Sequence, residues 1–224
     1  KPRLITASIA LLLLLVACGD DSSSVPAITD AAYEHFREQT TACGADRPET
    51  AREMTFATPD DLDLTGDIAA TLHTSCGDIA IELLPQVAPA TVNSFIFLAE
   101  QGYFDGTVSH RIAPRFVVQL GDPTATGRGG PGYRIPDELP PADFSYVAGV
   151  VAMANGGPDT GGSQFFIVFS DIDLDPDYTV FGIVTAGLDV LTRIESIPVG
   201  TNPNTFEPSL PLETLYIESI TIQR

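Results

Sequence analysis

The sequence of 224 residues predicts a mainly β fold: a closed antiparallel β-barrel capped by two helices, with a helical segment in front of it. Three observations favour this fold class. Glycine (19 residues) and proline (18 residues) are frequent, which is typical of turn-rich β architectures. Many short runs of strand-forming residues are separated by turn signals. Few helical stretches interrupt these runs, so a β architecture is favoured over a helical bundle.

The composition also limits the ligands. Thirty acidic residues face eleven basic ones, which gives a formal net charge of −19. Nucleic acid is excluded as the main ligand, because its binding depends on lysines and arginines that neutralise phosphates. The same charge disfavours a surface that lies flat on anionic lipid.

Residues 1–17 have the pattern of a signal peptide. Lys1 and Arg3 form a short positive start, and an apolar run follows from Leu4 to Ala17. Fourteen residues of helix span about 21 Å, which is shorter than the hydrocarbon core of about 30 Å. The sequence therefore indicates an export signal rather than a permanent membrane span.

The apolar run ends in Leu15-Val16-Ala17-Cys18-Gly19, which resembles the bacterial lipobox. In that motif the cysteine is lipidated and becomes the new N-terminus. The alternative is an ordinary signal peptide with an incidental cysteine at position 18. We expect a lipidated Cys18, a polar tether over residues 18–28, and a protein exported and lipid-anchored to the outer face of the cytoplasmic membrane.

Two further cysteines, Cys43 and Cys76, are expected to pair, because exported proteins occupy an oxidising compartment. Closing a loop of about 34 residues would stabilise the fold by roughly 3–4 kcal/mol. The alternative is two unrelated buried thiols. No metal site is expected, since His35, His73 and His110 are scattered and no ligand spacing joins them to the cysteines.

Residues 29–67 form a pre-segment ahead of the main domain. Thr29 to Thr41 is predicted to be a helix, with Ala32, Tyr33 and Phe36 on its apolar stripe. The stretch from Gly44 to Asp67 is acidic and weakly patterned. The disulfide would strap it onto the main domain.

The main domain is predicted over residues 68–224. A hairpin is expected around Cys76-Gly77-Asp78. One helix begins with Pro89 in its first turn and ends before Gly102. The predicted helices are Pro89–Gln101 and Val190–Ile197. The predicted strands are Ile68–His73, Ile79–Leu84, Val108–Ile112, Phe116–Leu120, Val147–Ala152, Phe165–Phe169, Thr179–Val184 and Leu215–Ile222.

Two motifs in this domain are rejected as cofactor sites. Gly127 to Gly132 fits G-x-G-x-x-G, but Tyr133-Arg134-Ile135-Pro136 cannot open the helix that a dinucleotide fingerprint needs, so a tight loop is the better interpretation. Asp171, Asp173, Asp175 and Asp177 alternate like a calcium loop. That loop needs a glycine and a glutamate at positions held here by Pro176 and Gly182. A solvated acidic loop is predicted, with weak Ca²⁺ binding as the alternative.

An arginine and two glutamines lie within otherwise apolar stretches of this domain. Arg111 lies within an apolar strand, and amide and aromatic residues follow at Phe116-Val117-Val118-Gln119 and at Gly162-Ser163-Gln164-Phe165-Phe166. Taken by themselves, these residues favour a salt-bridged arginine and core phenylalanines.

The chain nevertheless resembles the cyclophilins, the β-barrel peptidyl-prolyl cis-trans isomerases, over roughly residues 68–224. The motifs that carry the resemblance are Gly102-Tyr103-Phe104-Asp105-Gly106, His110-Arg111-Ile112, Phe116 to Asp122, Thr126 to Tyr133, Met153-Ala154-Asn155-Gly156-Gly157-Pro158, Gly162 to Ile167 and Val180-Phe181-Gly182. Their order and spacing are those of the family.

The resemblance implies roles for individual residues. Arg111 matches the catalytic arginine, and Gln119 and Gln164 match amides that contact the substrate backbone. Ala154 and Asn155 match residues that line the cleft. The walls of the proline pocket match Phe116, Val117, Phe166 and Leu174, and Tyr178 occupies a neighbouring position.

The chain departs from the family pattern at three of these places. Val117 stands where methionine is common, Tyr178 stands where histidine is common, and Asp173 precedes Leu174 where an aromatic residue is expected. The catalytic arginine and both amides are intact. We therefore expect an isomerase that acts on X-Pro bonds of unfolded or exported proteins without a cofactor. The alternative is a non-catalytic module that binds Pro-containing segments.

Overall fold

The computed structural model describes residues 31–224. The predicted signal peptide, the lipidated Cys18 and the tether over residues 18–28 lie outside the described residues. Helix α1 (Ala31–Glu38) lies within the helix predicted from Thr29 to Thr41. Across residues 31–224, no helix has the length and apolar character needed to cross a membrane.

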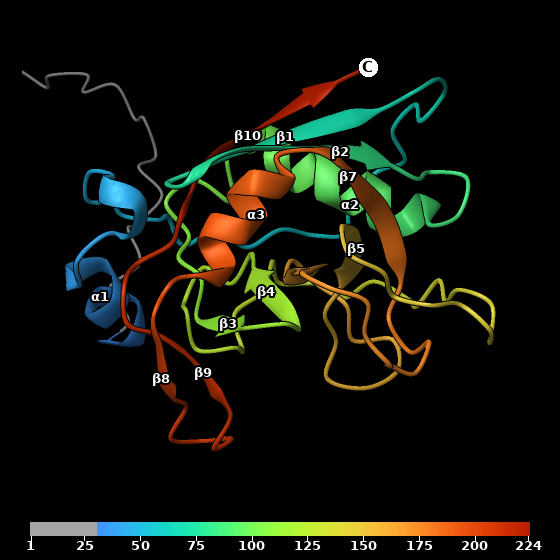
Figure 1. Ribbon diagram of the computed structural model, residues 1–224. Coiled ribbons are helices and arrows are strands. Elements are labelled where there is room, and N and C mark those ends of the chain that lie inside the picture. The colour runs from blue at the N-terminus through green and yellow to red at the C-terminus, as the bar shows by residue number, and fades with distance from the viewer. Residues whose placement is uncertain (1–30) are drawn as a thin grey trace, which may run out of the picture.

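Eight antiparallel strands form one strongly curled sheet (Figure 1). Their order across the sheet is β10-β1-β2-β7-β5-β6-β4-β3. The strands are β1 (Ala69–Thr74), β2 (Gly77–Leu83), β3 (Arg111–Ala113), β4 (Val117–Leu120), β5 (Val150–Met153), β6 (Phe165–Val168), β7 (Val180–Ala186) and β10 (Ile217–Gln223). The mainly β barrel predicted from the turn-rich sequence is confirmed in this form.

The edge strands β3 and β10 are joined through the segments that precede them. The Ser109 amide donates to the Leu215 carbonyl at 2.8 Å, and the Ile217 amide donates to the Thr107 carbonyl at 2.9 Å. Val108 and Tyr216 form an antiparallel bridge between these bonds. Residues 107–110 therefore close the curled sheet. The strand predicted from Val108 to Ile112 becomes regular, as β3, only at Arg111.

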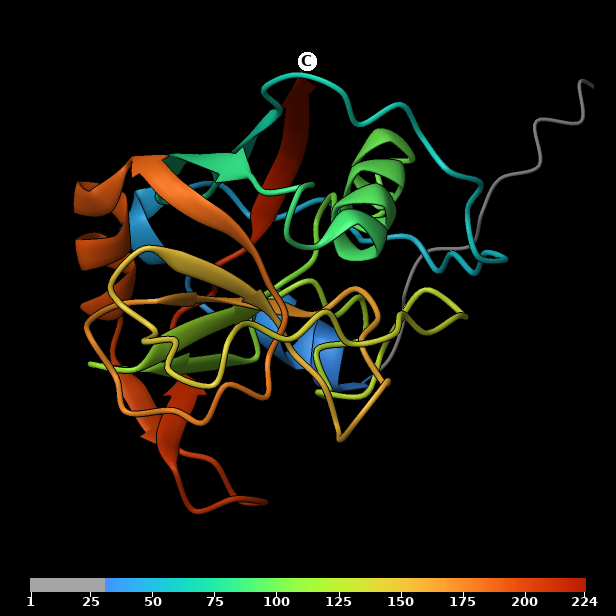
Figure 2. The same ribbon diagram turned by 90° about the vertical axis from the view of Figure 1, so that its right-hand side faces the viewer.

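Helices α2 (Pro89–Glu100) and α3 (Leu188–Glu195) cover opposite sides of the curled sheet (Figure 2). Pro89 lies in the first turn of α2, where its missing N–H breaks no hydrogen bond. The next two amides, of Ala90 and Thr91, donate to the Glu138 carboxylate at 2.9 Å each. A carboxylate at a helix N-terminus also complements the helix dipole.

Strand alternation separates two apolar layers. Inward-facing residues such as Ile112, Val118 and Ile167 join α2 and α3 in the barrel core. Phe95 of α2 lies there within 5.5 Å of the Phe104, Phe165 and Phe181 rings, measured between ring centroids. The alternate residues of β4, β5 and β6 point outward and form a second apolar cluster. This outer cluster carries the candidate site.

The pre-segment packs onto the barrel as predicted. The Tyr33 hydroxyl accepts from the Ala51 amide at 2.7 Å and donates to the Gly106 carbonyl at 2.9 Å. The predicted pair Cys43–Cys76 forms a disulfide. Farther along, the Leu62 amide donates to the Asn93 side chain at 2.7 Å, so this segment runs along α2 (Figure 2).

Loss of the disulfide is expected to lower the free energy of unfolding. Replacing Cys43 and Cys76 by serine frees the pre-segment in the unfolded chain, and we expect a loss of about 3–4 kcal/mol. Urea unfolding of the variant, compared with wild type under reducing and non-reducing conditions, measures this. Equal midpoints for the variant and the oxidised wild type would contradict it.

One hairpin is absent from the sequence prediction. Strands β8 (Val199–Thr201) and β9 (Pro208–Pro211) pair with each other outside the main sheet, and β9 packs against β3. Two of the four residues of β9 are prolines, which cannot donate to a ladder and are typical of such edge positions.

Candidate active site

The register of the sheet places the predicted site residues in one row. Arg111 on β3 pairs with Gln119 on β4, which pairs with Phe166 on β6. Phe166 pairs in turn with Ala152 on β5. Paired residues share a face of a sheet. A guanidinium, a carboxamide and a phenyl ring therefore lie side by side on the outer face of the barrel.

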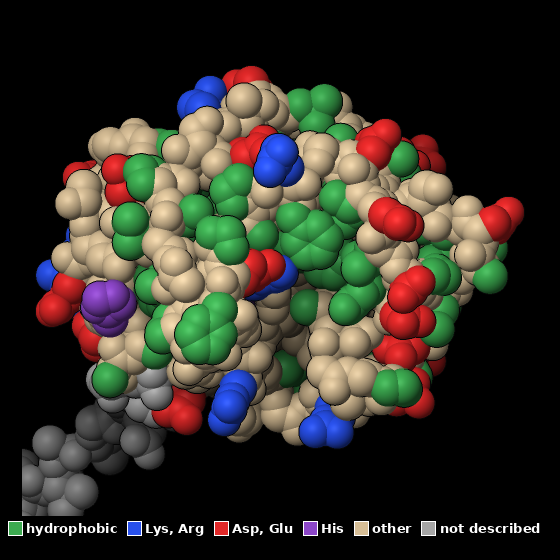
Figure 3. Space-filling view, turned by 60° about the horizontal axis from the view of Figure 1, so that its bottom comes forward, with side chains coloured by type: hydrophobic (Ala, Val, Ile, Leu, Met, Phe, Trp, Pro, Cys, Tyr) green, Lys and Arg blue, Asp and Glu red, His purple; other side chains and the backbone are tan. Residues whose placement is uncertain are grey.

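This row opens into a cavity of about 270 Å³. Figure 3 shows this face hollowed between hydrophobic side chains. Nine residues line the cavity, and each of them is a residue that the sequence analysis named: Arg111, Phe116, Val117, Gln119, Ala154, Asn155, Phe166, Leu174 and Tyr178. The remaining predicted residue, Gln164, lines a neighbouring cavity of about 350 Å³, which shares Gln119, Ala154 and Asn155 with the first.

The loop from Asp171 to Tyr178 forms one wall. Its four aspartates are exposed, while Ile172, Leu174, Pro176 and Tyr178 alternate with them and turn toward the protein. The Tyr178 ring contacts the Phe166 ring edge-on, with centroids 5.4 Å apart. The loop is thus acidic and solvated on its outer side, as predicted, while its inner side forms an apolar wall of the cavity.

Arg111 is held on three sides. Its Nε and Nη2 donate to the two carboxylate oxygens of Glu207 at 2.7 Å each. Its Nη1 donates to Gln119 Oε1 at 3.4 Å, and its Cζ lies 5.4 Å from the centroid of the Phe116 ring. The salt-bridged arginine considered from the sequence is therefore present. The same guanidinium also lines the cavity, so the ion pair does not remove it from the site.

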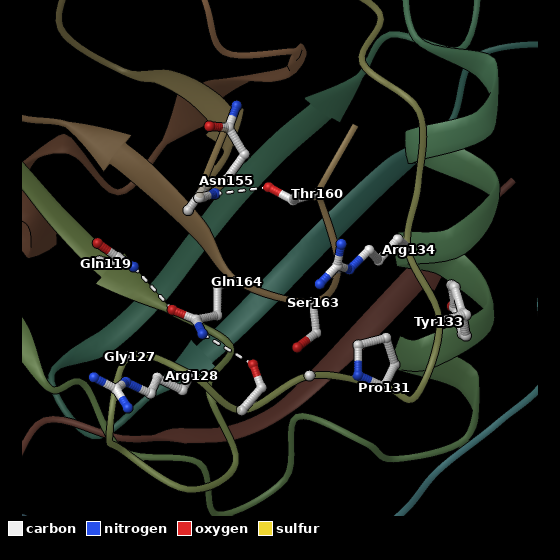
Figure 4. Close-up of a pocket in the computed structure, with 15 residues that line it drawn as sticks. Gln119, Gly127, Arg128, Pro131, Tyr133, Arg134, Asn155, Thr160, Ser163 and Gln164 are labelled. Carbon is white, nitrogen blue, oxygen red and sulfur yellow. Dashed lines mark hydrogen bonds between the residues drawn. The ribbon is translucent and has the colours of Figure 1, made fainter. Parts of the chain in front are cut away.

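The two glutamines form a connected chain of amides (Figure 4). Gln119 Nε2 donates to Gln164 Oε1 at 2.9 Å, and Gln164 Nε2 donates to the Gly129 carbonyl at 2.9 Å and to Asp122 Oδ2 at 3.4 Å. Each carboxamide is thereby fixed in orientation. The chain links the cavity that contains Arg111 to the loop over residues 127–134.

Three residues that shape the site had no predicted role. Asp122 is fully buried and accepts from the Gly127 amide at 2.6 Å, which holds the loop that carries Gly129. Ser163 is buried and donates to the Gly121 carbonyl at 2.7 Å. Glu207 lies on the hairpin of β8 and β9, 96 residues from its partner Arg111. Asp122 follows the apolar run of β4 after one glycine, which is a usable signal in the sequence, whereas nothing in the sequence marks Glu207.

Two ionisable groups beside Arg111 have shifted pKa values. The hydrogen bonds from Arg111 are the main cause of a pKa of Glu207 below its ordinary value. The ion pair is therefore fully formed at neutral pH, and its stabilisation is lost only as the pH falls through that lowered value. Burial lowers the pKa of His110, so its ring is neutral at physiological pH, although Asp122 opposes the shift.

This geometry defines a site for a peptide segment with a compact apolar side chain next to a polarisable amide. The apolar walls accept the side chain, while a guanidinium and two carboxamides face the backbone. No side chain is placed as a nucleophile with an adjacent base among the nine cavity-lining residues. An arrangement of this kind suits a reaction that rotates a bond rather than breaking one.

Comparison with known proteins agrees with this class. Residues 69–221 match the family described as cyclophilin type peptidyl-prolyl cis-trans isomerase/CLD. Peptidyl-prolyl cis-trans isomerase-like 3 of Rattus norvegicus is 45% identical over 159 residues, covering 69% of this chain and 96% of that protein. A probable peptidyl-prolyl cis-trans isomerase B of Mycobacterium tuberculosis is 42% identical over 144 residues, covering 58% of this chain and 46% of that protein.

A solved structure is also similar to this chain. The crystal structure of a Cryptosporidium parvum cyclophilin type peptidyl-prolyl cis-trans isomerase is similar with a TM-score of 0.63 and 31% identity, covering 71% of this chain and 99% of that one. A second crystal structure of that protein was obtained in the presence of the dipeptide Ala-Pro. This chain belongs to the cyclophilin-type peptidyl-prolyl cis-trans isomerase family and is an isomerase. The described part of the pre-segment, residues 31–67, lies outside the family match.

Proposed function

We propose that this isomerase acts on X-Pro bonds of exported proteins at the outer face of the cytoplasmic membrane, with Arg111 as its catalytic residue. The observation that carries the proposal is the cavity in which Arg111 and Gln119 face the apolar walls of Phe116 and Phe166. The signal-like start, the lipobox around Cys18 and the disulfide support an exported setting.

The reaction needs little covalent chemistry. Resonance gives the C–N bond of an X-Pro peptide a rotation barrier of about 18–20 kcal/mol. Uncatalysed isomerisation takes about 10–100 s at 25 °C. Rotation localises the lone pair on the prolyl nitrogen, so a donor aimed at that nitrogen stabilises the twisted amide more than the planar one.

The cavity provides such a donor in suitable surroundings. The Arg111 guanidinium stays charged at any physiological pH and lies beside the rings that would hold the proline. One charge-assisted hydrogen bond contributes roughly 1.5–3 kcal/mol, which corresponds to about 10–100-fold in rate. The apolar walls and the fixed amides of Gln119 and Gln164 would hold the two flanking groups while the bond turns.

Exchange spectroscopy by NMR on an X-Pro peptide tests the site. We expect enhanced cis/trans exchange, together with shifts of the backbone amides of Gln119, Ala154 and Phe166 on titration with the peptide. Peptide-induced shifts confined to other faces of the protein would contradict the assignment. Shifts at the cavity without enhanced exchange would indicate a binding module.

The proposed anchor predicts a separate result. Replacing Cys18 by serine removes the thiol that would carry the lipid, so the protein is expected to move from the membrane fraction to the soluble fraction of a bacterial host. Globomycin, which blocks processing of lipoproteins, should leave an unprocessed precursor of the wild type. A variant that remains quantitatively in the processed, membrane-bound form would contradict the lipid anchor.

A further inference from the structure

The hairpin of β8 and β9 contributes a carboxylate to the site from outside the cavity. Glu207 contacts Arg111 through both of its oxygens, at 2.7 Å from Nε and at 2.7 Å from Nη2. Among the described residues that line the cavity, Glu207 is absent. The carboxylate therefore binds the guanidinium without itself lining the space that a substrate would occupy.

The hydrogen-bond count of the guanidinium supports this arrangement. An arginine side chain has five N–H groups. Within residues 31–224, two of them donate to Glu207 and one donates to Gln119. Two N–H groups remain for a substrate. A two-point pair between arginine and a carboxylate also fixes the plane of the guanidinium, which a single hydrogen bond does not.

The other contacts of Arg111 would hold it less firmly. The bond to Gln119 is long, at 3.4 Å, and the Phe116 ring lies 5.4 Å from Cζ. By contrast, the backbone around Glu207 is tied down, because its carbonyl accepts from the Asn202 amide at 2.8 Å and from the Ser209 amide at 2.9 Å. Strand β9 packs against β3, which carries Arg111.

We propose that Glu207 is a positioning residue, which holds the guanidinium of Arg111 in the plane that presents its two remaining N–H groups to the prolyl amide. This inference rests on the proposed catalytic role of Arg111. It assigns the hairpin of β8 and β9, which lies outside the main sheet, a part in the reaction.

The test measures kcat and KM separately for Glu207→Gln by NMR line-shape analysis of an X-Pro peptide. We expect kcat to fall about 5–20-fold with KM changed less than about twofold, because the walls of the cavity are untouched. Glu213→Gln is the matched control: it removes the same charge from the segment just after β9, outside the residues that line the cavity, and is expected to keep wild-type kinetics. The Arg111 Nε–Hε resonance, assigned by its loss in Arg111→Ala, should shift in Glu207→Gln and not in Glu213→Gln.

A double-mutant comparison separates this proposal from the proposed function. If Glu207 acts through Arg111, then Glu207→Gln has no further effect on kcat in the Arg111→Ala background. An unchanged or raised kcat in Glu207→Gln alone would overturn the positioning role, and a raised value would mean that the carboxylate weakens the guanidinium. Full activity of Arg111→Ala would overturn the proposed function instead.

Discussion

Arg111→Ala is expected to lower kcat/KM for an X-Pro peptide about 10–100-fold, since it removes one charge-assisted hydrogen bond to the twisted amide. The fold should survive, because Arg111 is a quarter exposed and its loss leaves Glu207 with access to water. A protease-free assay of isomerisation measures the activity, and urea unfolding checks the fold. Peptide affinity should change little, since Phe116, Phe166 and Leu174 still form the apolar walls.

Two further variants define what the arginine does. Arg111→Lys keeps a positive charge but cannot form the two-point pair with Glu207, so we expect activity well below wild type. Arg115→Ala removes a guanidinium four residues away, from the exposed turn between β3 and β4, and should leave the activity unchanged. Wild-type turnover in Arg111→Ala would refute the assigned chemistry, even though the family membership would stand.

The strands of this fold could be predicted because their residues alternate or form short apolar runs between turns. Val117 and Gln119 face the outer cluster and the site, while Val118 and Leu120 face the barrel core. A strand packed on both faces has a nearly continuous apolar sequence, and a polar residue within it is conspicuous. For this reason Arg111 and Gln119 stand out as unusual in the sequence itself.

The parts that escaped prediction depend on partners far away in sequence. The strand predicted from Val108 to Ile112 is regular only from Arg111, because the backbone hydrogen bonds just before it join Thr107 and Ser109 to residues 215–217. The hairpin of β8 and β9 contains prolines in short strands, which no alternation rule identifies. The local pattern of apolar and polar residues does not show which distant segments pair with each other.

The same limit applies to the site. The family resemblance supplied all nine residues of the cavity and the neighbouring Gln164, because motif spacing fixes them. It did not supply Glu207, since the carboxylate meets Arg111 only when a hairpin 96 residues later folds back onto β3. Only the three-dimensional structure shows that Arg111 is salt-bridged to Glu207 and also lines the cavity.

Asp122 is a position outside the cavity where one substitution is expected to lower both stability and activity. Its side chain is fully buried and accepts four hydrogen bonds, from the Thr124 amide and hydroxyl at 2.8 Å each, the Gly127 amide at 2.6 Å and Gln164 Nε2 at 3.4 Å. Asp122→Ala removes the acceptor of the Thr124 and Gly127 amides, while the Thr124 hydroxyl and Gln164 Nε2 keep their contacts with Thr126 and Gly129. We expect the free energy of unfolding to fall by about 3 kcal/mol, measured by urea denaturation.

Activity should fall with Asp122→Ala as well, by about 10-fold in kcat/KM, because the variant releases two constraints on one amide. Gln164 loses its bond to the carboxylate, and the loop that carries the Gly129 carbonyl, its other partner, is no longer held through Gly127. Asp143→Ala, an exposed aspartate in the segment before β5, is the control and should stay within about 0.5 kcal/mol of wild type. If Asp122→Ala unfolds at the wild-type midpoint with wild-type kcat/KM, then the amide chain does not depend on this carboxylate. The orientation of Gln119 and Gln164 would then be set by their mutual hydrogen bond together with the bonds to Arg111 and to the Gly129 carbonyl.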